Sequence, residues 1–470
     1  MPAAVRTDHV RTDHVRPDTR RNGIEAVLDA LARKAPRDSH LHNTHVLLLK
    51  GRAPTLALVR DHVRTRAPNV PALGCVARGG RWTTSSAFEA ADHVHELVLD
   101  DRTGGHDLLA SALLDGDLPV HAPRWGLWLV HGYADDEYAL CYRSHHGFQD
   151  ASASQSCIRG LFGAPAPDND APPMRPRLSP KAAARVTRDL AHAFLPTGRP
   201  PRLPAGGDGA RAIARARVDL TRLHAVACAA GVSINDVHLA LSAAAVHAWI
   251  RWANPDRRTL YACVPLDTRL RGKTETGVGN KLGMIRVPLH DGEEVTAESL
   301  TATATSAADT RAPEYRATAR RMLELVPGPV GRWATHHLLR PAHTAMINSR
   351  VAYPRGLSFA DTPVHDAFVV PSLFPGHLCF ITLSSHGSNA HVAFVTDARR
   401  PALDRTIRHW QACLDALEAE LGLRTPESPP APHPHPTRPA PATTARPTPH
   451  GSDAQTSTAT AHHPRAADPR

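Results

Sequence analysis

The sequence predicts a mixed α/β fold of two subdomains with a cleft or tunnel between them. Short apolar runs of strand composition alternate with longer segments in which apolar residues recur every three or four positions, the pattern of amphipathic helices packed on sheets. A stretch rich in proline and glycine, residues 163–210, separates two such series and is predicted to be a crossover linker. The predicted subdomains are therefore residues 21–162 and 211–424.

Both ends of the chain are predicted to be disordered. Residues 1–20 contain a small repeat of the pentad VRTDH and too few apolar residues to fold. Residues 425–470 are rich in proline, threonine, alanine and histidine, and they cannot bury enough apolar surface to offset the loss of chain entropy.

The elements of the first half are predicted from their apolar periodicity. A strand at residues 45–51 precedes a helix with Leu56, Val59 and Val63 on one face. Two further strand-like runs, residues 126–132 and 138–144, are separated by a short acidic segment of turn composition and are expected to form a hairpin. A helix is predicted to begin at Asp150, directly after the hairpin.

The second half is predicted to repeat this mixture of strands and helices. In order along the chain, we expect a strand at 211–218, a helix at 220–230, a helix capped by Ser233 and running through Trp249, strands at 260–266, 282–289, 367–370, 377–383 and 391–395, and a last helix from Leu403 to Leu421.

Hydropathy and cysteine usage indicate a cytoplasmic location. No run approaches the roughly 18 to 20 apolar residues that a membrane span needs. The first residues lack the apolar core of a secretory signal. The 7 cysteines are an odd number, widely spaced and without a Cys-x-x-Cys pair, so we expect reduced, buried thiols and no metal site.

The segment from His145 to Ala151, HHGFQDA, is the strongest indication of chemistry in the chain. It places two imidazoles at the end of the predicted hairpin and a carboxylate at the start of a helix. A histidine is the usual general base near neutral pH for an alcohol, thiol or amine that attacks a carbonyl. Asp150 can cap the helix or pair with an arginine. The chain has 31 histidines, so it is the position between strand and helix that favours a reactive site.

This segment resembles the HHxxxDG hallmark of the bacterial wax ester synthase/diacylglycerol acyltransferase family. These coenzyme A-dependent acyltransferases share a chloramphenicol-acetyltransferase-like fold with peptide-synthetase condensation domains. Ala151 stands in place of the final glycine, and residues 348–354, NSRVAYP, depart from the family's SNVPGP-like stretch. The resemblance covers about residues 20–423 and includes PRW at 123–125 where the family has PLW, ND at Asn235-Asp236, VP at Val264-Pro265 and GN at Gly279-Asn280.

The resemblance implies the roles of the motif residues. It makes His146 the general base and sends the proton to the departing coenzyme A thiolate afterwards. His145 and Asp150 are then expected to support and orient the site. Asn235 and Asp236 are predicted either to contribute to the cofactor pocket or only to satisfy a helix N-terminus, and both alternatives stay open. Acyl-CoA is the implied co-substrate, and neither a metal nor a tightly bound cofactor is predicted.

The net charge of +10 points to an anionic partner. Nucleic acid is disfavoured because zinc-finger spacing and a P-loop are absent and aromatic residues make up only 5%. Arg269, Arg271 and Lys273 are predicted to hold the phosphates of coenzyme A at a tunnel mouth. Scattered solvated arginines remain an equally favoured explanation of the charge.

The predicted function is an acyl-CoA-dependent O-acyltransferase that esterifies a diacylglycerol or a long-chain alcohol. Contact with a membrane or lipid-droplet surface is expected for such acceptors. The first alternative is a condensation-type enzyme with a carrier-bound acyl group, and the second is a non-catalytic lipid-binding relative. Zinc hydrolysis through His145 and His146 is disfavoured, because neighbouring residues of a strand point to opposite faces.

Overall fold

The computed structural model describes most of the chain between Thr19 and Leu423. The described residues are 19–85, 89–119, 122–164, 179–194, 209–253, 261–269, 277–288, 292–308, 312–326, 328–341 and 346–423. The predicted disordered ends, residues 1–20 and 425–470, lie outside this part of the chain except for Thr19 and Arg20. These two residues are ordered, contrary to the prediction, because they pair as a short strand with residues 81–82. Most of the predicted linker and the predicted cofactor residues Arg271 and Lys273 also lie outside the described residues.

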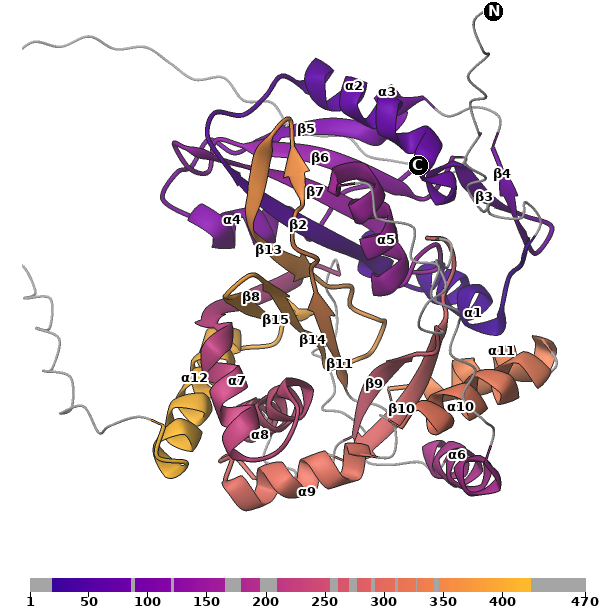
Figure 1. Ribbon diagram of the computed structural model, residues 1–470, viewed down its shortest axis with the longest axis vertical. Coiled ribbons are helices and arrows are strands. Elements are labelled where there is room, and N and C mark those ends of the chain that lie inside the picture. Colours follow the sequence, from indigo (N-terminus) through magenta and orange to yellow (C-terminus); the bar gives the residue numbers. More distant parts are fainter. Residues whose placement is uncertain are drawn as a thin grey trace, which may run out of the picture. The chain divides into compact units, whose positions relative to one another are not determined.

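Two six-stranded sheets form the centre of the fold, which confirms the predicted mixed α/β class (Figure 1). Their strand orders are β12-β13-β2-β7-β6-β5 and β10-β9-β11-β14-β15-β8. The first sheet comprises β2 (His42–Lys50), β5 (Val94–Val98), β6 (Trp125–His131), β7 (Glu137–His145), β12 (Ser358–Phe359) and β13 (Thr362–Val370), and the second comprises β8 (Arg211–Asp219), β9 (Tyr261–Asp267), β10 (Leu282–Pro288), β11 (Met346–Ala352), β14 (Cys379–His386) and β15 (Asn389–Asp397). A small third sheet has the order β1-β4-β3, from β1 (Thr19–Arg20), β3 (Cys75–Arg78) and β4 (Arg81–Thr84).

The helices cover the faces of these sheets. They are α1 (Gly23–Ala32), α2 (Leu56–Arg66), α3 (Ala90–His93), α4 (Gly105–Ala112), α5 (Ala151–Phe162), α6 (Pro180–Ala193), α7 (Leu220–Ala229), α8 (Ile234–Ala253), α9 (Ala297–Ala308), α10 (Pro313–Leu325), α11 (Gly328–Leu338) and α12 (Leu403–Glu420). The period-2 alternation of β2 divides its side chains between two clusters. Leu47 and Leu49 pack with α2 and α5, whereas Val46 and Leu48 pack with α4.

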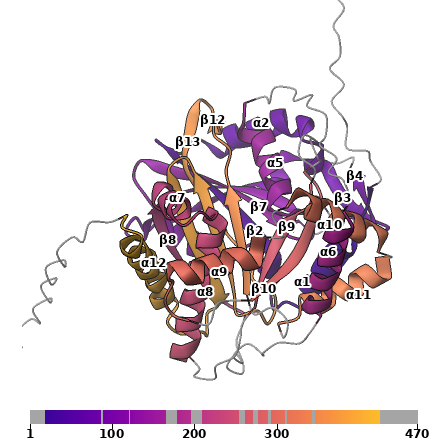
Figure 2. The ribbon, with the colours of Figure 1, turned by 60° about the horizontal axis from the view of Figure 1, so that its bottom comes forward.

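The apolar stripe predicted for the last helix is confirmed. In α12, Ile407, Trp410 and Leu414 are buried against α8 and the second sheet. Helices α7, α8 and α12 lie together beside β8 in Figures 1 and 2. Trp410 is fully buried, so this helix holds the C-terminal end of the folded body on the second sheet.

One predicted strand lies in a sheet that the sequence did not indicate. The run at residues 367–370 was expected within the second half, and it is the end of β13. This strand leaves the second half and pairs antiparallel with β2 of the first sheet, Phe368 opposite Val46. The first sheet is therefore completed by a segment more than 300 residues away in the chain, and the two halves are interlocked.

Helix α1 was not predicted, although its start has a recognisable signature. Asn22 is the N-cap, Glu25 is the third helical residue, and each side chain accepts a hydrogen bond from the other's backbone N–H, which is a capping box. The Asn-x-x-Glu spacing could have been read from the sequence. The helix matters because its residues line two cavities of the site described below.

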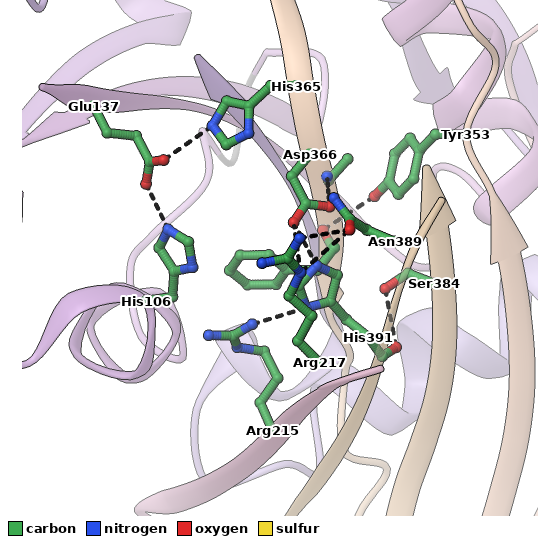
Figure 3. Close-up of polar contacts among 12 residues, drawn as sticks. His106, Glu137, Arg215, Arg217, Tyr353, His365, Asp366, Ser384, Asn389 and His391 are labelled. Atoms are coloured by element: carbon green, nitrogen blue, oxygen red, sulfur yellow. Dashed lines mark hydrogen bonds and ion pairs between the residues drawn. The ribbon is translucent and has the colours of Figure 1, made fainter. Parts of the chain in front are cut away.

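A polar network joins the two large sheets at a second place (Figure 3). His391 of β15 is fully buried; its Nδ1 accepts a hydrogen bond from Arg215 at 2.9 Å, so its Nε2 donates to Asp366 of β13, also at 2.9 Å. Nearby, the Glu137 carboxylate is shared by His106, His365 and Lys50. Burial opposes the ionised form of Glu137, but the hydrogen bonds from His106 and Lys50 outweigh it and lower its pKa to about 2.

Within the described residues, no single helix has the length and hydropathy of a membrane span. The bent pair α7 and α8, whose arms meet at 99°, passes that test when both are taken together.

Candidate active site

The two motif histidines stand where β7 meets β2. In the antiparallel register His42 lies opposite His145, the last residue of β7. The His146 backbone N–H then donates to the Leu41 carbonyl at 2.7 Å, so the chain stays attached to its neighbour for one residue beyond the strand. The predicted hairpin strands, and the histidine pair at their end, are confirmed.

His145 supports the loop. Its Nδ1 accepts a hydrogen bond from the Gly147 backbone N–H at 3.0 Å, which leaves the proton of the neutral ring on Nε2. Nε2 lies 3.8 Å from Asp38 Oδ1. Burial, with the nearby charges of Arg124 and His42, holds the pKa of His145 well below its ordinary value. The His145 ring is therefore neutral, and its Nδ1 is occupied by the hydrogen bond that stabilises the turn.

His146 faces the opposite side and lines an apolar cavity. The cavity has a volume of about 30 Å³, and Leu28, Phe374 and Phe380 are among the residues around it. The His146 ring stands edge-on to Phe374, with centroids 5.5 Å apart. Burial lowers its pKa below the ordinary 6.5, although contacts with its own backbone, Asp150 and Asn280 act in the other direction. A neutral imidazole thus faces an apolar space, and its buried Nδ1 has no hydrogen-bond partner among the described residues.

A second apolar cavity adjoins the first. It has a volume of about 60 Å³ and shares three lining residues with the His146 cavity: Ile24, Leu282 and Met284. Its far end is formed by α6, α10 and α11, through residues such as Leu190, Tyr315 and Leu338. Together the two cavities trace an apolar path from the motif histidine towards the second sheet's covering helices.

Asp150 makes both contacts that the sequence allowed. Its Oδ1 accepts from the Ala153 backbone N–H at 2.9 Å and caps α5. Its Oδ2 accepts from Arg269 at 3.0 Å and from the Lys281 backbone N–H at 2.8 Å. The carboxylate is fully buried, so every bond replaces lost hydration. Arg269 also bonds Asp267 at 3.2 Å. One nitrogen of the predicted cofactor residue Arg269 is therefore held by carboxylates of its own chain.

The loop before β10 closes over the motif. Gly279 donates from its backbone N–H to the Phe148 carbonyl at 2.7 Å. The Asn280 side chain donates to the His146 carbonyl at 2.8 Å, and its backbone N–H donates to Glu25 of α1 at 2.9 Å. Asn280 thus connects the motif, α1 and the second half. The sequence had singled out Gly279 and Asn280 only as landmarks.

The predicted residues Asn235 and Asp236 lie at the start of α8. The Asp236 side chain accepts from the Ser233 backbone N–H at 2.9 Å and from the Ser233 hydroxyl at 2.7 Å, closing the helix N-terminus. Asp236 is fully buried, whereas Asn235 is partly buried. These contacts support the interpretation of Asp236 as a helix cap. Neither Asn235 nor Asp236 is among the residues that line the His146 cavity.

The altered segment at residues 348–354 packs into the core. Most of it forms β11, and Tyr353 follows the strand. The Tyr353 hydroxyl donates to the Phe368 carbonyl at 3.1 Å and lies 2.8 Å from His45 Nδ1. Val351 and Tyr353 belong to the apolar cluster of the first sheet. The departure from the family pattern therefore places an aromatic side chain between the two halves.

Sequence reasoning missed the polar residues around His145. His42 Nε2 lies 2.8 Å from Asp38, and Arg124 donates to the same carboxylate. Burial opposes the charge of Asp38, but His42 and Arg124 lower its pKa. In the sequence, Arg124 is visible only as the arginine that replaces leucine in the PRW segment. The structure explains this arginine by its pairing with Asp38, which is 86 residues away in the chain. Among the described residues, no group of three His, Cys, Asp or Glu side chains is arranged to hold a metal ion.

Comparisons with known proteins bear on the family and the fold of this chain. Sequence models described as the wax ester synthase/diacylglycerol acyltransferase catalytic domain and the WS/DGAT C-terminal domain match residues 59–195 and 278–421. The two matches together span more than half of the chain. A probable diacyglycerol O-acyltransferase, tgs2 of Mycobacterium tuberculosis, is 25% identical over 384 residues, which are 73% of this chain and 84% of that protein.

Solved structures share the fold at lower identity. The wax ester synthase/diacylglycerol acyltransferase from Marinobacter aquaeolei VT8 is 21% identical, with a TM-score of 0.56 over 86% of this chain and 100% of that one. The starter condensation domain of rhizomide synthetase, solved as a mutant in complex with C8-CoA, is 12% identical, with a TM-score of 0.57 over 86% of this chain and 95% of that one. Both similarities establish the architecture.

Gly279 provides a test of the closure over the motif. Its φ of +82° is in the left-handed region, and a Cβ would lie 2.5 Å from Glu25 Oε1. Gly356 has a similar φ of +76° but open space around it. Both substitutions with alanine carry a backbone cost of about 1–2 kcal/mol. We expect Gly279→Ala to lower the free energy of unfolding, measured in urea, by at least about 1 kcal/mol more than Gly356→Ala. Equal losses would contradict the close packing of this loop on α1.

Proposed function

Since this chain belongs to the wax ester synthase/diacylglycerol acyltransferase family and is an acyltransferase, we propose that it transfers a fatty acyl group from coenzyme A to the hydroxyl of a diacylglycerol or a long-chain alcohol. The observation that carries the proposal is the position of His146. A neutral imidazole lines an apolar cavity that continues towards α6, α10 and α11. An apolar path that ends at a base suits an aliphatic substrate with one reactive polar end.

The proposed chemistry follows from that arrangement. His146 accepts the proton of the acceptor hydroxyl while the oxygen attacks the thioester carbonyl. The C–O bond forms, and the carbonyl oxygen becomes negative in a tetrahedral intermediate. Collapse of the intermediate breaks the C–S bond, and the imidazolium returns its proton to the thiolate of coenzyme A. The products are an ester and free coenzyme A, without an acyl-enzyme.

The motif around His146 supports this role. His145 is engaged with Gly147, and Asp150 with α5, Arg269 and Lys281, so neither is available for proton transfer. Both instead restrict the conformation of the chain on each side of His146. A base held by packed neighbours loses little conformational entropy when the transition state forms.

The experiment that tests the proposed reaction is a panel of donors and acceptors. Acyl-CoA of several chain lengths, and the same acyl groups on a carrier protein, are offered with fatty alcohols, diacylglycerol and an amine, and released thiol and ester are measured. Ester formation from acyl-CoA supports the proposal. Turnover only with a carrier-bound donor and an amine would favour a condensation-type reaction. No turnover with any donor and acceptor pair would favour a lipid-binding relative.

His146→Ala is expected to reduce turnover by about 10²- to 10⁴-fold while leaving the fold intact, because it removes a general base. His145→Ala serves as the matched neighbour. It deprives the Gly147 N–H of its acceptor and is expected to lower the melting temperature more than His146→Ala does. A folded His146→Ala enzyme with the wild-type rate would contradict the assignment.

The pH dependence gives a second measurement of the same base. Because burial lowers the pKa of His146, the free enzyme keeps the imidazole neutral at pH values where an exposed histidine is already half protonated. We therefore expect kcat/KM to rise with pH to a plateau, with the midpoint of the rise below pH 6.5. This rise of kcat/KM with pH should be absent from the residual activity of His146→Ala. A midpoint above 6.5 would contradict a buried neutral base.

Ala151 is proposed to be compatible with activity. It is the first residue of α5, it follows an extended N-cap residue, and it does not have a positive φ. Glycine at this position has no conformational advantage and costs up to about 1 kcal/mol in a helix. Ala151→Gly is expected to change the rate of coenzyme A release only a few-fold. A silent wild-type enzyme that gains turnover with Ala151→Gly would show that the natural chain has lost its catalytic role.

The acceptor is proposed to enter from a lipid surface beside α11. Val330 and Trp333 on this helix are 51% and 62% exposed, while Thr335 and Leu338 line the apolar path. Arg332 and Arg340 are exposed next to the apolar side chains. Exposed aromatic and basic groups together are typical of surfaces that bind anionic membranes.

Trp333→Ser is expected to weaken binding to phosphatidylglycerol vesicles several-fold and to reduce turnover of diacylglycerol presented in them. Turnover of a short, soluble alcohol should be unchanged, because the substitution leaves His146 untouched. Leu58→Ser, on the exposed face of α2, is the control for loss of an exposed apolar residue. Equal vesicle binding by Trp333→Ser and wild-type protein would place the lipid contact elsewhere.

A further inference from the structure

A large polar cavity lies on the other side of the motif from the apolar path. Its volume is about 670 Å³, against about 30 Å³ for the cavity at His146. Four arginines line it: Arg21, Arg33, Arg78 and Arg124. Its inner wall is the motif itself, through His145, Gly147 and Phe148. A volume of this size is within the range of ligand and cofactor pockets.

The charge of this arginine cavity is not neutralised by its own acidic residues. Asp29 forms an ion pair with Arg21 at 2.7 Å, and Asp38 is held by Arg124 and His42. Arg33 and Arg78 are exposed and have no ionic or hydrogen-bonding side-chain partner among the described residues. Two guanidinium groups therefore remain free to bind an anion, and guanidinium is well matched to phosphate oxygens.

Helix α1 and the motif together separate the arginine cavity from the apolar one. On α1, Ile24 and Leu28 line the apolar cavity, whereas Asp29 and the C-cap residue Arg33 line the arginine cavity. In the motif, His146 lines the apolar cavity, and its neighbour Gly147 lines the other. A Cβ on Gly147 would lie 2.5 Å from Asp29 Oδ1, so glycine allows the motif to approach α1 closely. At the proposed base, two neighbouring residues of one loop therefore line the two different cavities.

We propose that the arginine cavity binds the phosphate-bearing part of coenzyme A, with Arg33 and Arg78 as its principal phosphate ligands. This assignment rests on the proposed acyl-CoA-dependent function. The thioester is then delivered at the motif, where Gly147 of this cavity adjoins His146, and the acyl chain or the acceptor occupies the apolar cavities on the far side. Donor phosphates and lipophilic groups approach the base from two chemically different compartments.

Two further observations favour this cavity over Arg269, the one predicted phosphate-binding cation among the described residues. Arg269 is 14% exposed and bonded to Asp150 and Asp267, so its charge is already balanced inside the protein. Arg124 stands where the related PLW pattern has leucine, and it brings a charge to the cavity that leucine lacks. Its pairing with Asp38 neutralises an acidic group that would otherwise repel phosphate.

The test compares Arg33→Gln, Arg78→Gln and the double variant with Arg408→Gln, which removes an exposed arginine from α12 and is the control for net charge. Calorimetric binding of free coenzyme A, 3′-dephospho-coenzyme A and adenosine 3′,5′-bisphosphate needs no turnover. Each single variant is expected to weaken coenzyme A binding by about five- to tenfold, and the double variant by more, with a smaller dependence on salt. Arg408→Gln should bind as the wild type does.

Kinetics distinguish phosphate binding from general damage. In the double variant, KM for acyl-CoA should rise at least tenfold with kcat nearly unchanged, while KM for the acyl thioester of N-acetylcysteamine, which has no phosphate, should stay the same. Wild-type affinity for coenzyme A in the double variant would overturn the proposal, even if acyl transfer is fully active. Loss of binding to phosphatidylglycerol vesicles with unchanged affinity for coenzyme A would assign the cavity to lipid phosphates instead.

A failure of the proposed function would look different. If no donor and acceptor pair gives turnover but the arginine variants still lose affinity for coenzyme A, the acyl-transfer proposal is wrong and the binding site stands. If turnover is normal and the variants bind coenzyme A like the wild type, the reaction stands and this site is wrong.

Discussion

The buried carboxylate of Asp150 is the constraint on which the rest of the site depends. It is fully shielded from water and bonded at once to the start of α5, to the Lys281 backbone and to Arg269. A carboxylate in such surroundings is stable only while all its partners stay in place, because an unpaired buried charge costs several kcal/mol. The loop before β10 is therefore held against the motif, and the His146 backbone between them has little freedom.

The interlocking of the two halves also restricts movement at the site. β13 belongs by sequence to the second half but completes the first sheet beside β2, and the Asp366–His391 pair ties it to β15. The site lies where three segments meet: the motif after β7, the loop before β10 and helix α1. Relative movement of the halves would have to break a buried charge network as well as strand pairing, which favours a preorganised site over one assembled on binding.

Burial also sets the state of the histidines. His42, His145 and His146 all have pKa values lowered mainly by desolvation, so this cluster is uncharged near neutral pH. Neutral rings explain how several imidazoles can lie beside one another and beside Arg124 without strong repulsion. Positive charge is instead concentrated on arginines that reach solvent, on the opposite side of α1 from the apolar path. The polar and the apolar cavities are separated by helix α1 and the motif.

The sequence by itself determined the fold class, the hairpin that presents His145 and His146, and the cap that Asp150 forms on α5, because each depends on local periodicity or on residues a few positions apart. The apolar stripe of α12 could be predicted for the same reason. Only the tertiary structure decided the sheet of β13, the partnership of Asp150 with Arg269 across 119 residues, and the division of α1 between two cavities. Helix α1 shows the limit most clearly: its Asn-x-x-Glu cap was visible in the sequence, but nothing local indicates what either face packs against. Strand pairing and buried ion pairs join residues distant in the chain, and their energy depends on a packing that no local pattern encodes.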